Sequence, residues 1–218
     1  FDKVSAAVSC YKKRIKIIVC GASSELVIPL KFLYKFSRKD IKPVLPKHNE
    51  DVMTWGDFIK NGKNCKAICP VQRADDTAVI LFSGGTTGTP KTIELTNKNL
   101  NTYACSVVRA ADINIDNVRM LSIMPIFHGF GLGVGIHTAL SISGTCALIP
   151  RFSKETYGSI IKRLRPTVIP GVPTLFEAMI NTKGLEKSDL SFIDLILCGG
   201  DSLPQKLKTD IDKFLKTK

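Results

Sequence analysis

The pattern of apolar and polar residues becomes regular from residue 77 onward. Five short runs rich in apolar and β-branched residues have the length of buried strands. Between them, apolar residues recur every three or four positions, which is typical of amphipathic helices. This alternation predicts an α/β fold with βαβ units on a largely parallel sheet. The predicted strands are residues 77–82, 118–124, 145–149, 167–170 and 193–198, and the predicted helices are residues 97–110, 130–141, 153–164, 174–181 and 204–216.

The first 75 residues carry a less regular pattern. Residues 14–20 predict one strand, and the mostly apolar residues 24–36 follow it, with Pro29 inside a stretch that would otherwise suit a helix. Proline and glycine then punctuate residues 41–75, which predict a connector with a short helical piece around Trp55. We therefore expect part of a first α/β subdomain plus a connector in residues 1–75, and a second α/β region in residues 76–218.

A long uncharged run raises the alternative of a membrane span. Residues 120–150 contain no Asp, Glu, Lys or Arg, which is long enough to cross a bilayer. Pro125, His128, His137 and several serines and threonines interrupt the run, and it contains a second strand signal. Two buried elements of an α/β core explain it better, so we expect no membrane span.

Composition and charge narrow the class of protein. The chain is 44% hydrophobic and 23% charged, which is ordinary for a soluble globular protein. Its net charge of +12 comes from scattered Lys and Arg without regular aromatic residues between them, so we expect no nucleic-acid partner. The seven cysteines are widely spaced and include no CxxC pair, which favours reduced thiols in a cytoplasmic protein over disulfides or a zinc site.

The strongest chemical signal is the loop at residues 83–91, SGGTTGTPK, directly after a predicted strand. Glycines let backbone N–H groups approach a ligand, hydroxyls donate further hydrogen bonds, and Lys91 adds a mobile positive charge, which together suit a phosphate. It is not a Walker loop, because Pro90 precedes the lysine where that pattern has glycine. A flexible surface loop is the alternative.

These nine residues, with the following TNKNL at 96–100, closely resemble the phosphate loop of the adenylate-forming (AMP-binding) enzymes. That superfamily contains acyl-CoA synthetases, peptide-synthetase adenylation domains and luciferases. The resemblance implies that residues 76–218 form a nucleotide-binding region, in which Thr87 and Lys91 act on the phosphates. The residues that it implies for binding ATP in this loop are Ser83, Gly84, Gly85, Thr86, Thr87, Gly88 and Lys91.

Residues 124–131, MPIFHGFG, resemble the second core motif of the family. The resemblance implies that His128 contacts the carboxylate or the adenylate, and that Phe130 and Gly131 line the acyl pocket. A lone histidine is more often structural, and the glycines of this segment equally suit close helix packing.

Two further glycine-containing segments look like the family. Val172, within GVPT at 171–174, opens a predicted helix and is a second candidate for the acyl pocket. Gly199, Gly200 and Asp201 match the segment whose backbone lies flat against adenine, although alone they would be an ordinary turn.

The resemblance implies part of an ATP-dependent carboxylic acid–CoA ligase that uses ATP, Mg²⁺ and CoA, without a metal site made by this chain alone. A carboxylic acid would attack the α-phosphate to give acyl-adenylate and pyrophosphate, and CoA would then take the acyl group. An adenylation or acyl–carrier-protein ligase domain, whose acceptor is an acyl carrier protein, remains open. So does a non-catalytic nucleotide-binding domain. The uncharged pocket candidates favour an apolar acyl or aryl group.

The resemblance covers about residues 14–215, which is only the middle of a family member. The aromatic-Gly-Thr-Glu motif does not appear in this sequence, and neither does the small C-terminal domain with its catalytic lysine. The chain also begins at Phe1. We therefore expect a fragment of the large N-terminal domain that does not complete adenylation by itself.

Overall fold

The computed structural model divides the chain into two compact units, residues 1–70 and 71–218, and each is described by itself. The assignment of residues 1–75 and 76–218 to parts of a larger enzyme stays a prediction. The residues that the structure describes are 2–12, 14–21, 51–63, 65–66, 70–83, 90–149 and 152–215.

In the first unit, two short parallel strands pair and a helix begins directly after the second. This helix starts where it does because the Thr54 hydroxyl accepts the backbone N–H of Asp57 at 3.2 Å, an N-cap contact. The strand predicted at residues 14–20 is confirmed at residues 17–19, and the helical piece around Trp55 is confirmed. Residues 24–36 lie outside the described ranges. The elements are α1 (Asp2–Ser9), β1 (Ile17–Val19), β2 (Val52–Thr54) and α3 (Trp55–Gly62).

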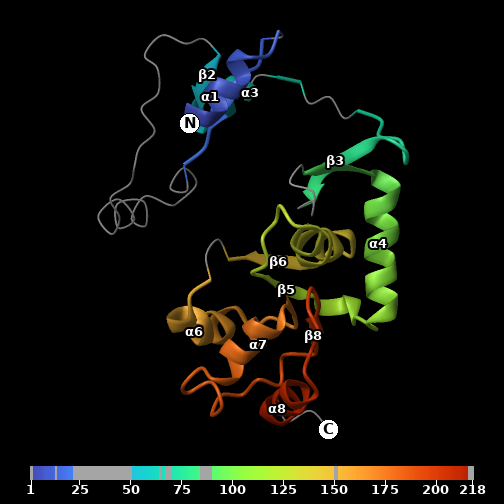
Figure 1. Cartoon of the computed structure of the whole chain (residues 1–218), viewed down its shortest axis with the longest axis vertical. Helices are drawn as coiled ribbons and strands as arrows, with labels where there is room; N and C mark the ends of the chain where they lie inside the picture. Colours follow the sequence, from blue (N-terminus) through green and yellow to red (C-terminus); the bar gives the residue numbers. More distant parts are fainter. Residues whose placement is uncertain are drawn as a thin grey trace. The chain divides into compact units, whose positions relative to one another are not determined.

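A four-stranded parallel sheet forms the centre of the second unit (Figure 1). The strand order is β6-β5-β7-β8. The chain passes from β5 to β6 on one side of β5, and then to β7 on the other side, so the strand order reverses between β5 and β7. Ligands of open parallel sheets bind beyond the carboxyl ends of the strands at such a reversal. The strands are β5 (Arg119–Ser122), β6 (Thr145–Leu148), β7 (Val168–Gly171) and β8 (Leu195–Cys198).

Helices cover both faces of this sheet. Met120 and Val168 pack in the apolar cluster beneath the helices of residues 97–141, whereas Leu121 and Ile169 pack in the cluster beneath the helices of residues 154–215. Neighbouring residues of a strand point to opposite faces, so a sheet buried on both sides needs consecutive apolar residues. The predicted α/β class is confirmed. The helices are α4 (Asn97–Ala110), η1 (Ile115–Asn117), η2 (Gly131–Thr138), α5 (Ala139–Ser141), α6 (Lys154–Leu164), α7 (Pro173–Ile180) and α8 (Gln205–Leu215).

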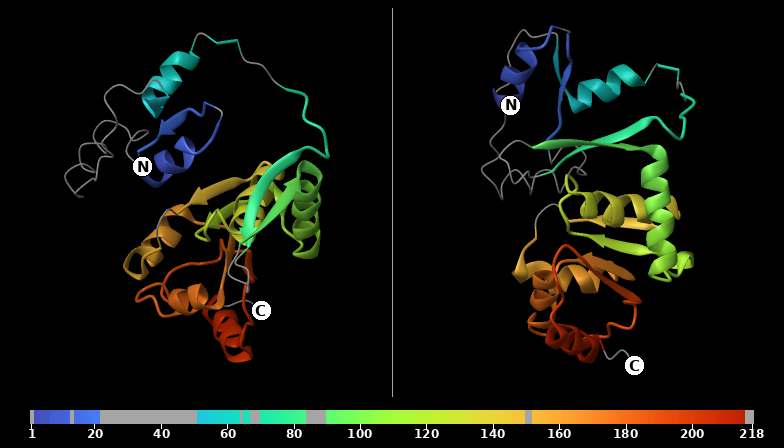
Figure 2. Two further views of the ribbon diagram at one scale, coloured as in Figure 1. Left: turned by 45° about the horizontal axis from the view of Figure 1, so that its top comes forward. Right: turned by 45° about the vertical axis from the view of Figure 1, so that its right-hand side comes forward.

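One predicted strand lies elsewhere. β3 (Thr77–Ser83) pairs antiparallel with β4 (Lys91–Thr96) in a separate two-stranded sheet, seen in Figure 2 as a hairpin leading into α4. The strand predicted at residues 77–82 is therefore confirmed, but it does not join the parallel sheet. The link between these strands is far shorter than the dozen or more residues that a parallel crossover needs, so the chain can only turn back on itself.

The uncharged run at 120–150 is divided between β5, a helical segment and β6. The predicted helix 130–141 is a π-helix, η2, followed by one α-helical turn. Among the described residues, no helix is long and apolar enough to cross a membrane. Thr96 is the N-cap of α4, because its hydroxyl accepts the Asn99 N–H while Asn99 Oδ1 accepts the Thr96 N–H.

Candidate functional site

Three of the segments singled out in the sequence meet at the carboxyl ends of the parallel strands. Residues 123–131 follow β5, Val172 follows β7, and residues 199–201 follow β8. β5 and β7 are the neighbours between which the strand order reverses. The fold therefore places these segments where open α/β sheets bind ligands.

Contacts join the segments to one another. A Cβ built on Gly199 would lie 3.3 Å from Cε2 and Cζ of Phe130, so the phenyl ring rests against this glycine. Gly200 has a φ of +82°, and a Cβ there would lie 3.3 Å from Cγ1 of Val172. The left-handed backbone at Gly200 suits glycine. The substrate candidates Phe130 and Val172 thus form one wall with the nucleotide candidates Gly199 and Gly200.

His128 is exposed at the edge of this wall. Its Nδ1 accepts the backbone N–H of Phe130 at 3.2 Å, while its own backbone N–H donates to the Pro125 carbonyl at 3.1 Å. Because Nδ1 is an acceptor, the neutral imidazole carries its proton on Nε2. The ring is therefore oriented to offer Nε2–H to a ligand.

Gly131 occupies a position that has no room for a side chain. A Cβ there would lie 2.1 Å from the carbonyl oxygen of Pro125 and 2.8 Å from that of Met124. Both neighbours are backbone atoms, which cannot swing away. The loop that carries His128 is consequently folded tightly back on the start of η2.

The two ends of the predicted phosphate loop lie side by side. Ser83 and Lys91 are paired across the antiparallel strands, and Lys91 is exposed. Residues 84–89 lie outside the described ranges, so the roles of Gly84, Gly85, Thr86, Thr87 and Gly88 stay predictions.

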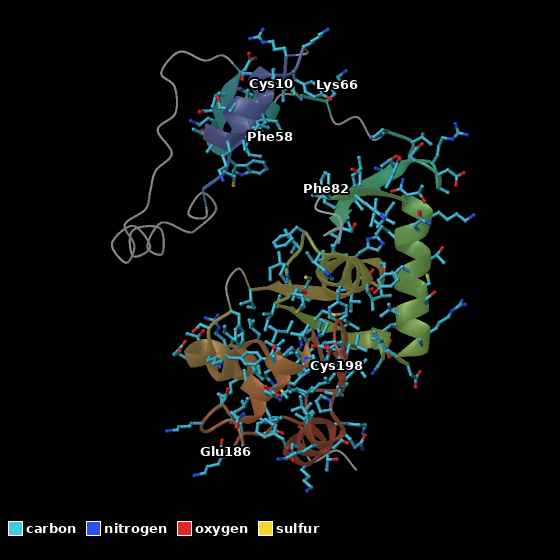
Figure 3. All side chains as sticks on the ribbon, viewed as in Figure 1. Cys10, Phe58, Lys66, Phe82, Glu186 and Cys198 are labelled. Atoms are coloured by element: carbon cyan, nitrogen blue, oxygen red, sulfur yellow. The ribbon has the colours of Figure 1, made fainter. Side chains whose placement is uncertain are left out.

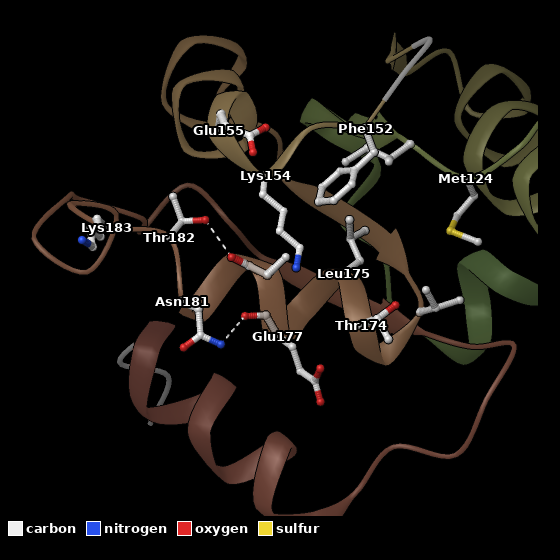
Figure 4. A pocket seen from close by; sticks show the side chains of 13 residues that line it. Met124, Phe152, Lys154, Glu155, Thr174, Leu175, Glu177, Asn181, Thr182 and Lys183 are labelled. Atoms are coloured by element: carbon white, nitrogen blue, oxygen red, sulfur yellow. Dashed lines mark hydrogen bonds between the residues drawn. The ribbon is translucent and has the colours of Figure 1, made fainter.

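A cavity of about 770 Å³, lined by both charged and apolar side chains, includes Val172 in its wall (Figure 4). Lys154, from the start of α6, points toward α7, which carries Glu177. The pKa of Glu155 is lowered, chiefly by a hydrogen bond from the Ser153 hydroxyl. The lining residues are Ile123, Met124, Phe152, Lys154, Glu155, Val172, Thr174, Leu175, Glu177, Ala178, Asn181, Thr182 and Lys183.

A separate apolar cavity of about 460 Å³ opens between α4, η2 and the hairpin. It contains no charged residue. A second apolar cavity of about 450 Å³ shares Leu81 and Leu132 with it and is lined by Val79, Ile80, Phe82, Ile126 and Phe127 as well. The first is lined by Leu81, Leu95, Asn99, Leu100, Tyr103, Gly129, Leu132 and Gly133.

Sequence reasoning missed most residues of this apolar cavity. Leu100 and Tyr103 of α4 have helical spacing, and that signal alone indicates a buried helix face rather than a cavity wall. Within the described ranges, no group of three or more His, Cys, Asp or Glu side chains could hold a metal ion, and the six described cysteines are all free.

Comparison with known proteins identifies the family. The family model for the AMP-binding enzyme matches residues 14–217. The chain belongs to the AMP-binding enzyme family. The match covers the segments at residues 123–131, 172 and 199–201 that the fold brings together, and the roles of their residues stay predictions.

Individual relatives agree with this membership. A long-chain-fatty-acid–CoA ligase of Bacillus subtilis (strain 168) is 28% identical over 201 residues, which cover 91% of this chain and 36% of that protein. The 4-coumarate–CoA ligase 4 of Arabidopsis thaliana is 30% identical over 137 residues, covering 62% of this chain and 24% of that protein. This AMP-binding chain thus spans about a third or less of the length of these relatives.

Solved structures show the same fold. The anthranilate CoA ligase AuaEII in complex with anthranoyl-AMP matches 99% of this chain and 36% of its own length, with a TM-score of 0.73 and 19% identity. The N-terminal domain of FACL13 from Mycobacterium tuberculosis matches 97% of this chain and 51% of its own length, with a TM-score of 0.69 and 19% identity. The AMP-binding chain therefore has the fold of the matched part of these proteins, which is about half of the N-terminal domain of FACL13.

Proposed function

We propose that this chain is the nucleotide- and acid-binding part of an AMP-forming carboxylic acid–CoA ligase in the cytoplasm. The observation that carries the proposal is the wall formed by Phe130, Val172, Gly199 and Gly200 at the reversal of strand order, with His128 at its edge. Membership of the AMP-binding family and the CoA ligases among the relatives support the same activity.

ATP would be held at two places. Lys91, with Ser83 and the loop between them, would bind the β- and γ-phosphates, because positive charge and hydrogen-bond donors offset the charge of the triphosphate. The adenine would lie against the backbone of Gly200 and Asp201, since Phe130 already covers Gly199. The Asp201 carboxylate accepts the Ser202 N–H at 2.7 Å, which fixes its direction beside the base.

His128 would act on the acid. With Nδ1 engaged by Phe130, its Nε2–H can donate to a carboxylate oxygen and hold the other oxygen toward the α-phosphate. That oxygen forms a bond to the α-phosphorus, the bond from this phosphorus to the bridging oxygen breaks, and pyrophosphate leaves. The product is an acyl-adenylate, whose AMP group is a far better leaving group than the original carboxylate oxygen.

The acid that this site favours is apolar. Gly129, next to His128 in the chain, lines the cavity between α4 and η2, and all the lining residues are uncharged. A charged tail would lose its hydration there without a compensating partner. An aliphatic or aryl acid would instead bury apolar surface.

The second step would transfer the acyl group to a thiol. The CoA sulfur attacks the acyl carbonyl carbon, the carbon–oxygen bond to the phosphate breaks, and AMP leaves. Mg²⁺ would be bound mainly through the phosphates of ATP and would neutralise their charge. A carrier-protein phosphopantetheine arm presents the same thiol, so the acceptor has to be identified by experiment.

Acid-dependent ATP–pyrophosphate exchange by the complete protein tests the proposal. A panel of aliphatic, aromatic, dicarboxylic and amino acids would be compared, with CoA and a phosphopantetheinylated carrier as acceptors in a second assay. We expect exchange with apolar acids and none from the 218-residue chain alone. No exchange with any acid would contradict the activity, and a preference for charged acids would contradict the substrate class.

A further inference from the structure

The π-helix η2, which follows the His128 loop, accepts hydrogen bonds from side chains of the sheet. The hydroxyl of Ser122, at the end of β5, donates to the carbonyl oxygen of Gly135. The thiol of Cys146, in the neighbouring strand β6, donates to the same oxygen at 3.2 Å and lies 3.0 Å from Ser122 Oγ. Two adjacent strands of the parallel sheet thus hold one carbonyl group of η2.

A second hydroxyl bonds within η2 itself. Thr138 Oγ1 donates to the carbonyl oxygen of Gly133, five residues earlier, at 2.8 Å. Serine and threonine in an α-helix reach carbonyls three or four residues earlier, so a spacing of five matches the wider π-turn. Thr138 is fully buried and Ser122 is 4% exposed. Both hydroxyls therefore act in the interior, where a carbonyl group needs a protein partner in place of water.

The Ser122–Gly135 hydrogen bond closes the segment of chain that carries His128. β5 ends at Ser122, the His128 loop follows, and η2 begins at Gly131. Gly131 lies against the Pro125 carbonyl without room for a side chain, whereas a Cβ on Gly135 would lie at an ordinary 3.5 Å from Ser122 Oγ. The segment is therefore fixed by backbone packing at its middle and by the Ser122 hydroxyl across its two ends.

The π form of η2 determines how the His128 loop is turned relative to the core. A residue advances about 100° around the axis of an α-helix, because one turn takes 3.6 residues. A change of η2 to α-helical bonding would shift its pairing by one residue, and would rotate one end against the other by about that angle. Thr138 and Ala139 are fully buried at the far end, so the rotation would fall on Phe130 and His128. The hydrogen bond from the Phe130 N–H to His128 Nδ1 would then be lost.

We propose that Ser122 is a positioning residue, which keeps η2 in the π form through the Gly135 carbonyl and so directs His128 toward the carboxylate. The catalytic consequence of this inference rests on the proposed function. Ser122 is buried beneath η2 and acts through that helix rather than on the acid. π-Helical segments are rare in proteins and are frequent at functional sites.

The kinetics of acid-dependent ATP–pyrophosphate exchange by the complete protein test this role. Ser122→Ala removes the hydroxyl without adding volume, and we expect kcat to fall about tenfold or more, because small misplacements of reacting groups are costly. KM for ATP should stay within about twofold, since the proposed nucleotide contacts at Lys91 and Gly200 lie outside η2. Thr167→Val is the matched control. Thr167 is also buried, and its hydroxyl donates to the Asn117 carbonyl at 3.1 Å at the amino end of the sheet, so this variant should lose stability but keep kcat.

A spectroscopic measurement tests the geometry without activity. In the 218-residue chain labelled with ¹⁵N-histidine, nitrogen chemical shifts at about pH 8.5, above the ordinary pKa of histidine, report which ring nitrogen carries the proton. We expect the Nε2–H form for His128 in wild type and a mixture of both tautomers in Ser122→Ala. Thr138→Val removes the other hydroxyl that binds η2 and should change the His128 signal in the same direction, whereas Thr167→Val should not. His128→Gln assigns the signal.

The outcomes separate the two proposals. A lower kcat and a mixed tautomer of His128 in Ser122→Ala, with neither in Thr167→Val, would support the positioning role. Wild-type kcat in Ser122→Ala, or an equal fall in Thr167→Val, would overturn it. A His128 that keeps the Nε2–H form in both Ser122→Ala and Thr138→Val would overturn it as well, and Thr138→Val carries the comparison if Ser122→Ala does not fold. No exchange by the wild type with any acid would overturn the proposed function, and the histidine spectra would still decide whether Ser122 orients His128.

Discussion

The β3–β4 hairpin and the wall at the carboxyl ends of β5, β7 and β8 differ in how their residues are held. Side chains of the hairpin are largely exposed, with 50% of Ile80 and 68% of Phe82 accessible to solvent (Figure 3 shows Phe82 on the strand). In the wall, Gly131 and Gly199 are in contact with neighbouring segments, and Ile169 in β7 is fully buried. Substitutions of close-packed residues in this region should therefore reduce stability, whereas truncation of exposed hairpin side chains such as Lys91 should chiefly affect ligand binding.

The largest effect is expected from Gly131→Ala. The added methyl group would lie 2.1 Å from a backbone oxygen, so the loop of His128 or the start of η2 must move. Overpacking costs about 1–3 kcal/mol where side chains can adjust, and we expect about 3 kcal/mol or more here because backbone must shift. Urea unfolding of the 218-residue chain measures the loss. Gly135→Ala should change stability by less than about 1 kcal/mol, and equal losses for the two variants would contradict the distinction.

Lys91→Ala should leave stability nearly unchanged but reduce activity. Lys91 is exposed on the hairpin, so its truncation should change the free energy of unfolding by less than about 0.5 kcal/mol. If the lysine neutralises phosphate charge in the transition state, the rate of acid-dependent ATP–pyrophosphate exchange by the complete protein should fall about 100-fold. Lys98→Ala, an exposed lysine on α4, is the matched control and should retain activity. A wild-type rate of ATP–pyrophosphate exchange in Lys91→Ala would show that Lys91 does not act on the phosphates, and would contradict a role of the hairpin in the proposed site.

Thr96 joins the hairpin to α4, because it ends β4 and caps that helix. Its hydroxyl accepts the Asn99 N–H at 3.2 Å, and replacement of such a cap by alanine costs about 1 kcal/mol. We expect the free energy of unfolding, measured with urea, to fall by about 1 kcal/mol in Thr96→Ala. Thr96→Ser keeps the hydroxyl and should keep most of this stability. An unchanged midpoint in Thr96→Ala would indicate that the hairpin and the packing of α4 hold the helix without its cap.

The contrast between the regions also explains what the sequence could predict. The parallel strands and their flanking loops follow from local signals, namely apolar runs, glycine turns and helix caps. The hairpin was missed because the apolar run at 77–82 does not specify its partner, which the length of the connection decides. The π-helix was missed because a glycine-rich apolar segment such as GLGVG at 131–135 has no period that separates it from an α-helix. The cavity depends on how α4 packs against η2, which the apolar pattern at Leu100 and Tyr103 does not encode.

The smallest effect concerns Cys198, which ends β8 within the wall (Figure 3). Its thiol pKa is raised, first by burial and then by the nearby Asp201 carboxylate. The folded state thus favours the neutral thiol, and this contribution to stability is fully present below the unfolded pKa of about 8.5 and declines as pH rises through the folded value.

At pH 8, iodoacetamide should alkylate Cys198 more slowly than the exposed Cys105 of α4. Asp201→Asn should accelerate the reaction at Cys198 only, and by a modest factor, because burial remains. An equal acceleration at both cysteines would indicate that the substitution loosens the unit rather than removing a charge beside the thiol, and would place Asp201 among the residues that hold the wall together.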